Sequence, residues 1–203
     1  KNTIMSIKNI SPLSKGGQGG SDSYLLDVTV TTGPTQSKNK IPVLFCCSNS
    51  VYNEFPIADV YDEKRNALNY IGDQKIIAHP PCRFWSKAHG LAKPRKNEYE
   101  LALWAIELIQ KNGGILEHPK QSKLFEYVGI SPTIEVNQQW WGHKMKKATW
   151  LYAVNVDLLP LPFNLVTQKT PHINQVSKKQ AMATPGLFAK YLLDSISQNG
   201  EKT

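Results

Sequence analysis

Cysteine is scarce in this chain of 203 residues: there are three, Cys46, Cys47 and Cys82, and two of them are adjacent. Three cysteines make a poor disulfide framework, and the N-terminus lacks the basic, apolar and small-residue order of a signal peptide. No apolar run approaches the ~20 residues that a membrane-spanning helix needs. We therefore expect a soluble protein of the reducing cytoplasm, without a membrane partner.

Acidic residues are also few, because 16 Asp and Glu stand against 24 Lys and Arg, for a net charge of +8. The hydrophobic fraction of 40% and the charged fraction of 20% are typical of one globular domain with a real core. A basic chain of this kind favours a polyanionic partner, and we expect nucleic acid, in particular DNA. A solvated lysine-rich surface is the alternative.

The first forty residues differ from the rest. They are rich in Gly, Ser and Lys and show no hydrophobic periodicity, apart from a single strand or hairpin arm expected at residues 24–32. We expect residues 1–40 to be a flexible or weakly structured extension, and residues 41–203 to be the compact domain.

Within that domain, short apolar runs alternate with a helical pattern. Strands are expected at residues 41–47, 76–78 and 113–119, a short strand followed by a helix at 57–70, and a strand, basic turn and second strand at 136–154. Helices are expected at 97–112, ended by Gly113 and Gly114, and at 185–198. This alternation predicts a single α/β domain with helices flanking the sheet.

Reactive side chains follow two of these strands. Pro80 and Pro81 end the strand 76–78, because proline cannot donate to a sheet ladder, and Cys82 comes next. Glu117 and His118 stand at the end of the strand 113–119. Ligands bind at the carboxyl ends of strands in open α/β sheets, so a nucleophile and a carboxylic acid are expected to meet there. The alternatives are a packed, inert Cys82 and a Glu117 that caps or forms an ion pair.

This order of motifs resembles the cytosine-5 DNA methyltransferases. That family has a Pro-Cys nucleophile motif and, after a helix, a Glu-Asn-Val motif, which here read Pro81-Cys82 and Glu117-His118-Pro119. The segment 144–152 falls where the family has a Gln-x-Arg-x-Arg strand entry, with Thr149 at the second arginine. The resemblance covers residues 41–196 and implies a Rossmann-like methyltransferase-type sheet.

The resemblance implies a role for each motif. Cys82 adds to carbon 6 of a cytosine flipped out of the stack, and Glu117 is the acid that holds the ring. A basic cleft and aromatic walls are then expected, the walls from Trp85, Trp140 and Trp141, for which core packing is the alternative. The expected nucleic-acid-binding residues are Arg83, Trp85, Ser86, Lys87, His89, Lys93, Arg95, Lys96, His143, Lys144, Lys146 and Lys147.

The resemblance also implies S-adenosylmethionine as cofactor, held near Pro80 and by Asp59 or Asp62. One departure concerns the glycine-rich Phe-x-Gly-x-Gly turn, which lets the cofactor approach the backbone. The corresponding residues 44–55 contain no glycine. A second departure is the lack of a long target-recognition insert, so a partner that supplies target recognition is expected.

Histidines cluster around these motifs. We expect His79 and His118 to act as acid or base and to lower the pKa of the Cys82 thiol. Packed, hydrogen-bonded histidines are the alternative, and His79 with Cys82 is a single pair of the kind found in zinc sites, so no metal is assigned. Two other functions stay open: a degenerate fold that only binds nucleic acid, and a Cys/His enzyme acting on a nucleotide without a methyl donor.

Overall fold

The computed structural model describes residues 4–7, 28–31, 39–86, 94–95, 97–162 and 176–198. The chain divides into two compact units, Lys1–Ser37 and Lys38–Thr203. In the first unit, β1 (Ile4–Ile7) pairs antiparallel with β2 (Val28–Thr31). Residues 28–31 of the strand expected at 24–32 thus form a strand, the rest of that range lies outside the described residues, and the partner strand β1 was not predicted.

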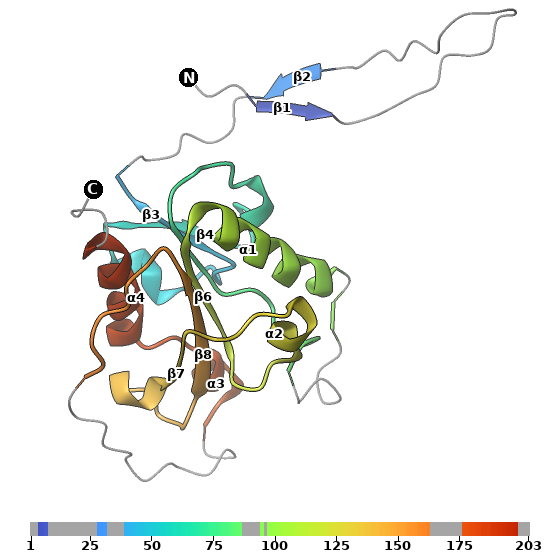
Figure 1. Ribbon diagram of the computed structural model, residues 1–203. Coiled ribbons are helices and arrows are strands. Elements are labelled where there is room, and N and C mark those ends of the chain that lie inside the picture. Colours follow the sequence, from blue (N-terminus) through green and yellow to red (C-terminus); the bar gives the residue numbers. More distant parts are fainter. Residues whose placement is uncertain are drawn as a thin grey trace, which may run out of the picture. The chain divides into compact units, whose positions relative to one another are not determined.

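The second unit is a mixed α/β domain built on a six-stranded sheet in the order β4-β3-β5-β6-β8-β7 (Figure 1). The strands are β3 (Ile41–Leu44), β4 (Ala58–Tyr61), β5 (Ile76–Ala78), β6 (Gly114–Pro119), β7 (Ile134–Asn137) and β8 (Ala148–Val154). The first four strands in this order are parallel, and β8 is antiparallel to both of its neighbours. The α/β class predicted from the sequence is confirmed.

The connections make this an open, doubly wound sheet. From β3 the chain runs outward to β4 and then returns to β5 on the other side of β3. The direction of winding therefore reverses between β3 and β5. In sheets of this type, the crevice outside the carboxyl ends of the strands at the reversal is the usual ligand site.

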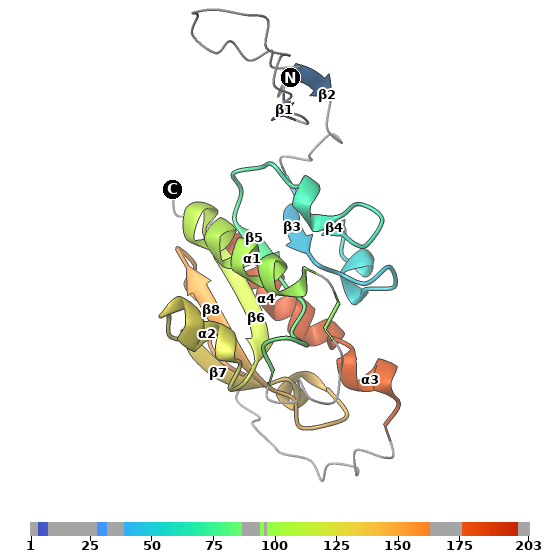
Figure 2. The same ribbon diagram turned by 90° about the vertical axis from the view of Figure 1, so that its right-hand side faces the viewer.

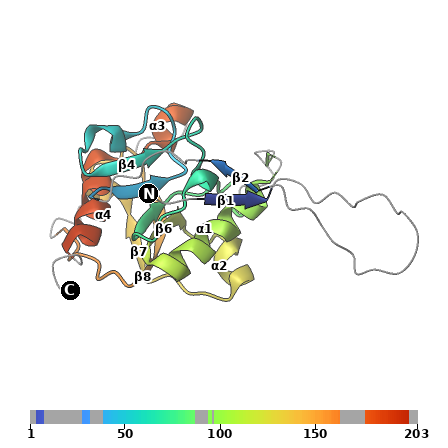
Figure 3. The same ribbon diagram turned by 90° about the horizontal axis from the view of Figure 1, so that it is seen from above.

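Helices cover both faces of the sheet (Figures 1 and 3). On one face, α1 (Glu98–Asn112) and α2 (Lys123–Val128) pack with strand residues such as Ile76 and Leu116; both helices stand in front of the sheet in Figure 2. On the other face, α4 (Gly186–Gln198) packs with Ile77 and Ile115. Consecutive residues of one strand pack into the hydrophobic clusters on opposite faces of the sheet, because side chains alternate along a strand.

Some elements differ from the sequence prediction. The helix expected after β4 is a single 3-10 turn, η2 (Ala67–Asn69), and two more such turns are η1 (Val51–Glu54) and η3 (Gln138–Trp141). The short helices α2 and α3 (Lys178–Met182) were not predicted. They span six and five residues, too few for hydrophobic periodicity to stand out.

Candidate functional site

Polar side chains gather at the carboxyl edge of the central strands. The backbone N–H of His79, directly after β5, still bonds to the Leu44 carbonyl at 3.1 Å, and the two prolines then release the chain toward Cys82. From β6 comes Glu117, at the same edge. Because β8 runs antiparallel, its first residues also lie here, together with η3.

His79 joins Glu117 to a buried tyrosine. Its Nδ1 lies 3.0 Å from Glu117 Oε2, and its Nε2 lies 3.0 Å from the hydroxyl of Tyr52 in η1. Burial raises the pKa of Tyr52 well above its ordinary value, so this hydroxyl is protonated and donates to Nε2. The proton of a neutral His79 then sits on Nδ1 and is donated to the carboxylate.

The second carboxylate oxygen is held from the other side. Gln138 Nε2 donates to Glu117 Oε1 at 2.8 Å and to Thr149 Oγ1 at 3.0 Å. Thr149 therefore helps to orient the Gln138 side chain. His79 and Gln138 together fix the orientation of the Glu117 carboxyl group, whose side chain is 11% exposed.

Glu117 is ionised despite its burial. Burial alone would raise its pKa, but the hydrogen bond from His79 and the positive charge of Lys147 outweigh burial and lower the pKa to about 2. In the free protein this side chain is a hydrogen-bond acceptor and cannot donate a proton at neutral pH.

Cys82 is a free, half-buried thiol close to that charge. Burial raises its pKa, the Glu117 carboxylate raises it further, and Lys147 and Arg83 act in the opposite direction. The prediction that histidine lowers the pKa of this thiol is wrong. The reason is that His79 turns both ring nitrogens to Glu117 and Tyr52.

His118 lies on the other side of β6, fully buried beside Phe125. Burial lowers its pKa to about 4, against the opposite effect of the Glu117 carboxylate and the Pro81 carbonyl. Neither ring nitrogen forms a hydrogen bond of normal geometry with any residue that the structure describes. His118 is therefore a neutral histidine inside the protein at physiological pH.

Both arginines expected to bind nucleic acid form ion pairs. Arg83 donates through Nε to Glu98 Oε2 at 3.2 Å and through Nη2 to Glu98 Oε1, so it ties the Cys82 loop to the start of α1. Arg95 lies on the surface, 3.5 Å from Glu63. Ser86 donates its backbone N–H to the Cys82 carbonyl at 2.8 Å.

The basic segment before β8 is divided between surface and interior. Lys144 and Lys146 are not part of the core, whereas His143 is buried and its Nδ1 lies within 2.9 to 3.1 Å of backbone atoms of Met145. Lys147 donates through Nζ to the Met182 and Ala183 carbonyls, and its charge also acts on Glu117 and Cys82. The other predicted residues Lys87, His89, Lys93 and Lys96 lie outside the described residues.

The three candidate tryptophans have different surroundings. Trp141 packs in the core against Phe188 of α4, with ring centroids 5.0 Å apart, and Trp140 is half-buried next to it. Trp85 is buried, and it lies against rings of α1 and α2 instead. Trp85 also lines a pocket at the surface.

The residues expected to hold S-adenosylmethionine are engaged elsewhere. The Asp59 carboxylate accepts from Arg65 Nη1 at 2.5 Å, and Asp62 Oδ1 accepts from the backbone N–H groups of Lys64 and Arg65. At the turn after β3, Phe45 has φ 64°, a left-handed conformation that glycine adopts more easily. Binding of S-adenosylmethionine by these acids stays a prediction.

Tyr52 and Gln138 were not identified from the sequence. The sequence pattern indicates only a polar turn around Tyr52 and a strand around Gln138, and single Tyr or Gln residues carry no spacing signal. Their role follows only from the strand order, which brings η1 and η3 to the same edge.

No family model matches the chain, and no curated protein matches it. In the part of the chain that the structure describes, no helix is long and apolar enough to cross a membrane. The same residues contain no group of three or more His, Cys, Asp or Glu side chains placed to bind a metal ion.

Proposed function

We propose that this chain is a nucleic-acid base-modifying enzyme of the cytosine-5 methyltransferase type, acting on DNA through Cys82. One observation carries the proposal: Cys82 stands at the carboxyl edge of a doubly wound sheet, next to an ionised Glu117 that His79 and Gln138 hold in place. The strand order, with antiparallel β8 between β6 and β7, is compatible with a Rossmann-like methyltransferase-type sheet.

Glu117 can bind a pyrimidine edge without losing its supports. A carboxylate has about four acceptor positions, and His79 and Gln138 occupy one on each oxygen. The remaining positions can accept from the 4-amino group of the bound cytosine and, once the thiol has added, from the newly protonated nitrogen 3. Because the carboxylate is already oriented, it stabilises the adduct, in which the 4-amino group and the protonated nitrogen 3 present two N–H groups side by side.

The step assigned to Cys82 is addition to carbon 6 of that base. A bond forms between Sγ and carbon 6, the electron pair of the 5,6 double bond moves toward nitrogen 3, and nitrogen 3 gains a proton in exchange for the thiol proton. Carbon 5 is then nucleophilic. In the family that the chain resembles, carbon 5 takes a methyl group from S-adenosylmethionine.

Hydrogen exchange at carbon 5 tests the addition without any methyl donor. While carbon 6 carries the thiol, carbon 5 can take up deuterium from heavy water, and elimination of Cys82 returns a deuterated cytosine. We expect DNA incubated with the protein in heavy water to yield deoxycytidine heavier by one mass unit, measured by mass spectrometry after digestion. S-adenosylmethionine is added in parallel to measure methylation.

Two variants control this experiment. Cys82→Ser should abolish the exchange, and Cys47→Ser, which changes the exposed cysteine, should leave it intact. If the unchanged protein gives neither exchange nor methylation on single- or double-stranded DNA, the enzymatic proposal is wrong.

A second function, binding of nucleic acid without chemistry, is favoured by the raised pKa of Cys82 and by the engagement of Asp59 with Arg65. In that case Cys82→Ala should leave the affinity for DNA unchanged while the unchanged protein shows no exchange. A Cys/His enzyme acting on a free nucleotide, the third candidate, should instead show turnover of mononucleotides that is insensitive to S-adenosylmethionine.

A further inference from the structure

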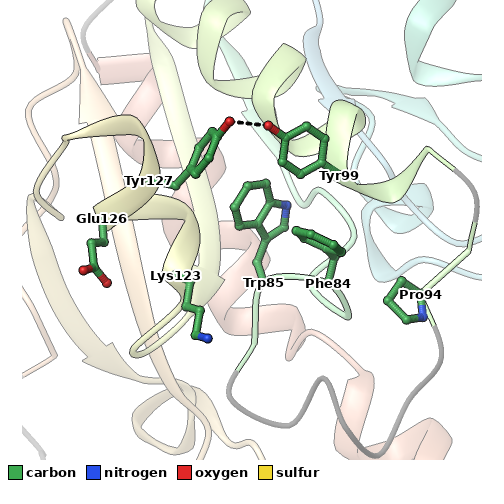
Figure 4. A pocket seen from close by; sticks show the side chains of 7 residues that line it. All are labelled: Phe84, Trp85, Pro94, Tyr99, Lys123, Glu126 and Tyr127. Atoms are coloured by element: carbon green, nitrogen blue, oxygen red, sulfur yellow. Dashed lines mark hydrogen bonds between the residues drawn. The ribbon is translucent and has the colours of Figure 1, made fainter.

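Next to the Cys82 loop, four aromatic rings surround a pocket of about 650 Å³ (Figure 4). The rings belong to Phe84 and Trp85 of the loop, Tyr99 of α1 and Tyr127 of α2, and the other lining residues are Pro94, Lys123 and Glu126. The loop places the pocket close to the candidate active site, because the backbone N–H of Trp85 donates to the Cys82 carbonyl at 3.1 Å.

The rings form one connected cluster. Trp85 and Tyr99 are stacked, with centroids 5.0 Å apart and ring planes at 21°, and Phe84 meets Trp85 edge-on at 5.0 Å. The hydroxyl groups of Tyr99 and Tyr127 hydrogen-bond to each other across the top of the cluster in Figure 4. This contact ties α1 to α2 above the Trp85 ring and helps to hold the rings in place.

Two features mark the cluster as a binding surface. Phe84 is 43% exposed and Tyr127 is 61% exposed, which is unusual for large aromatic side chains that belong to one cluster. Trp85 is 3% exposed, yet its indole Nε1 has no hydrogen-bond partner among the described residues, which a core optimised for stability would supply.

The charge around the pocket favours an anionic aromatic ligand. Lys123 lines the pocket, whereas the carboxylate of Glu126 points away from the rings in Figure 4. Lys123 is thus the basic side chain among the described residues that line the pocket. A quaternary ammonium group, the other ligand that aromatic pockets select, would meet the positive charge of Lys123 there.

We propose that this aromatic pocket stacks an unpaired nucleobase, so that the nucleic acid bound by this protein is single-stranded or locally opened. This inference rests on the proposed function, and it names the substrate form for the same site. Exposed rings accept any base by stacking, and Lys123 at the pocket can pair with a phosphate. A base in a closed duplex has both faces covered by its neighbours and cannot enter.

Fluorescence anisotropy with a short labelled oligonucleotide tests the proposal. The full chain should bind the single strand more tightly than the same sequence as a duplex. Phe84→Ala and Tyr127→Ala should each weaken single-strand binding by roughly tenfold and duplex binding much less. Leu187→Ala, which removes an exposed apolar side chain on α4, is the control and should change neither affinity.

A fold check and a photochemical readout keep the result interpretable. Circular dichroism should show unchanged spectra for both aromatic variants, and an oligonucleotide carrying a photoreactive thymine should cross-link to the peptide that contains Phe84 and Trp85. Equal affinity for single strand and duplex, or full affinity in both variants, would overturn the proposal. So would a mononucleotide that binds as tightly as the oligonucleotide with little dependence on salt.

The binding result and the proposed chemistry can fail separately. Cys82→Ala should retain single-strand binding while losing deuterium exchange at carbon 5. If exchange is absent in the unchanged protein but the aromatic variants still lose single-strand affinity, the pocket is retained and only the chemistry is rejected.

Discussion

At the scale of single residues, the charge of Glu117 dominates the candidate site. It is ionised because His79 and Lys147 outweigh its burial, and it raises the pKa of Cys82. Phe45, with φ 64° at the turn after β3, is a second local feature, because non-glycine residues in this conformation carry strain that is concentrated near functional sites.

The first prediction concerns the reactivity of Cys82. Glu117→Gln removes a negative charge beside the thiol, so the pKa of Cys82 should fall and its alkylation at neutral pH should become several-fold faster. Iodoacetamide labelling across a pH series, followed by peptide mass spectrometry, measures this for Cys82 apart from Cys46 and Cys47. Lys147→Met should slow the alkylation of Cys82, and Glu135→Gln, which changes an exposed carboxylate, should leave it unchanged. Slower alkylation in Glu117→Gln would show that the Glu117 charge does not raise the pKa of Cys82.

The second prediction concerns the pH dependence of stability. The pKa of His118 is lowered from 6.5 to about 4 in the folded protein, so the unfolded state binds the proton first as the pH falls. The stability that a neutral, buried His118 provides is complete above pH 6.5 and should be lost between pH 6.5 and pH 4. A shift of this size corresponds to about 3 kcal/mol.

Urea unfolding at several pH values measures the slope of the free energy of unfolding against pH between pH 6.5 and pH 4. In His118→Gln the slope between these pH values should be much reduced, because the titrating group is gone. His143→Gln, which removes another buried imidazole, serves as control and should retain the slope due to His118. A wild-type protein whose free energy of unfolding is flat over this range would contradict the prediction.

At the scale of elements, the contact between β5 and β6 depends on one glycine. Gly114 has φ 132°, and a Cβ atom there would lie 2.1 Å from the Ile76 carbonyl oxygen. Because this atom belongs to the paired backbone of β5, it cannot move aside. The two strands that carry His79 and Glu117 can thus pair at this register only with glycine at this position.

The third prediction follows from that contact. Gly114→Ala should lower the free energy of unfolding by at least about 3 kcal/mol, since strain and overlap with backbone add. Gly129→Ala is a matched control: its φ is 73°, but a Cβ atom there would meet no atom of the described residues within 4 Å, so a loss of about 1 kcal/mol is expected. If chemical denaturation gave equal losses of unfolding free energy for the two variants, the short distance from the Gly114 Cβ position to the Ile76 carbonyl would not be the cause of the destabilisation.

At the scale of the whole molecule, the second unit contains two hydrophobic clusters, formed by residues whose burial the structure describes. The buried apolar side chains run from Ile41 to Ile196 and form one cluster on each face of the sheet. Since α4 contributes Phe188 and Leu192 to one of these clusters, the C-terminal helix is as necessary to the fold as the strands.

The fourth prediction tests this division of the chain. A protein of residues 38–203 should still unfold as one cooperative unit, because it retains both hydrophobic clusters. Removal of residues 186–203 should prevent cooperative unfolding altogether. Differential scanning calorimetry gives both results, and a first variant that does not unfold cooperatively would contradict the assignment of both clusters to residues 38–203.

Several elements were predictable because their determinants are local. An apolar run ended by prolines specifies β5, glycines bound the start of β6, and hydrophobic periodicity followed by Gly113 specifies α1. The positions of Cys82 after β5 and of Glu117 near the end of β6 follow from the same patterns. These features depend on sterics and hydrophobic burial within a few residues of each other.

Only the tertiary structure determined how these groups act. Tyr52, His79, Glu117 and Gln138 come from four separate segments, and the sheet order alone makes them hydrogen-bond partners. The raised pKa of Cys82 depends on burial and on a charge that lies far away in the sequence. Electrostatic fields, desolvation and the aromatic pocket arise from proximity in space, for which the chain has no local pattern, whereas strands and helices arise from neighbours along the chain.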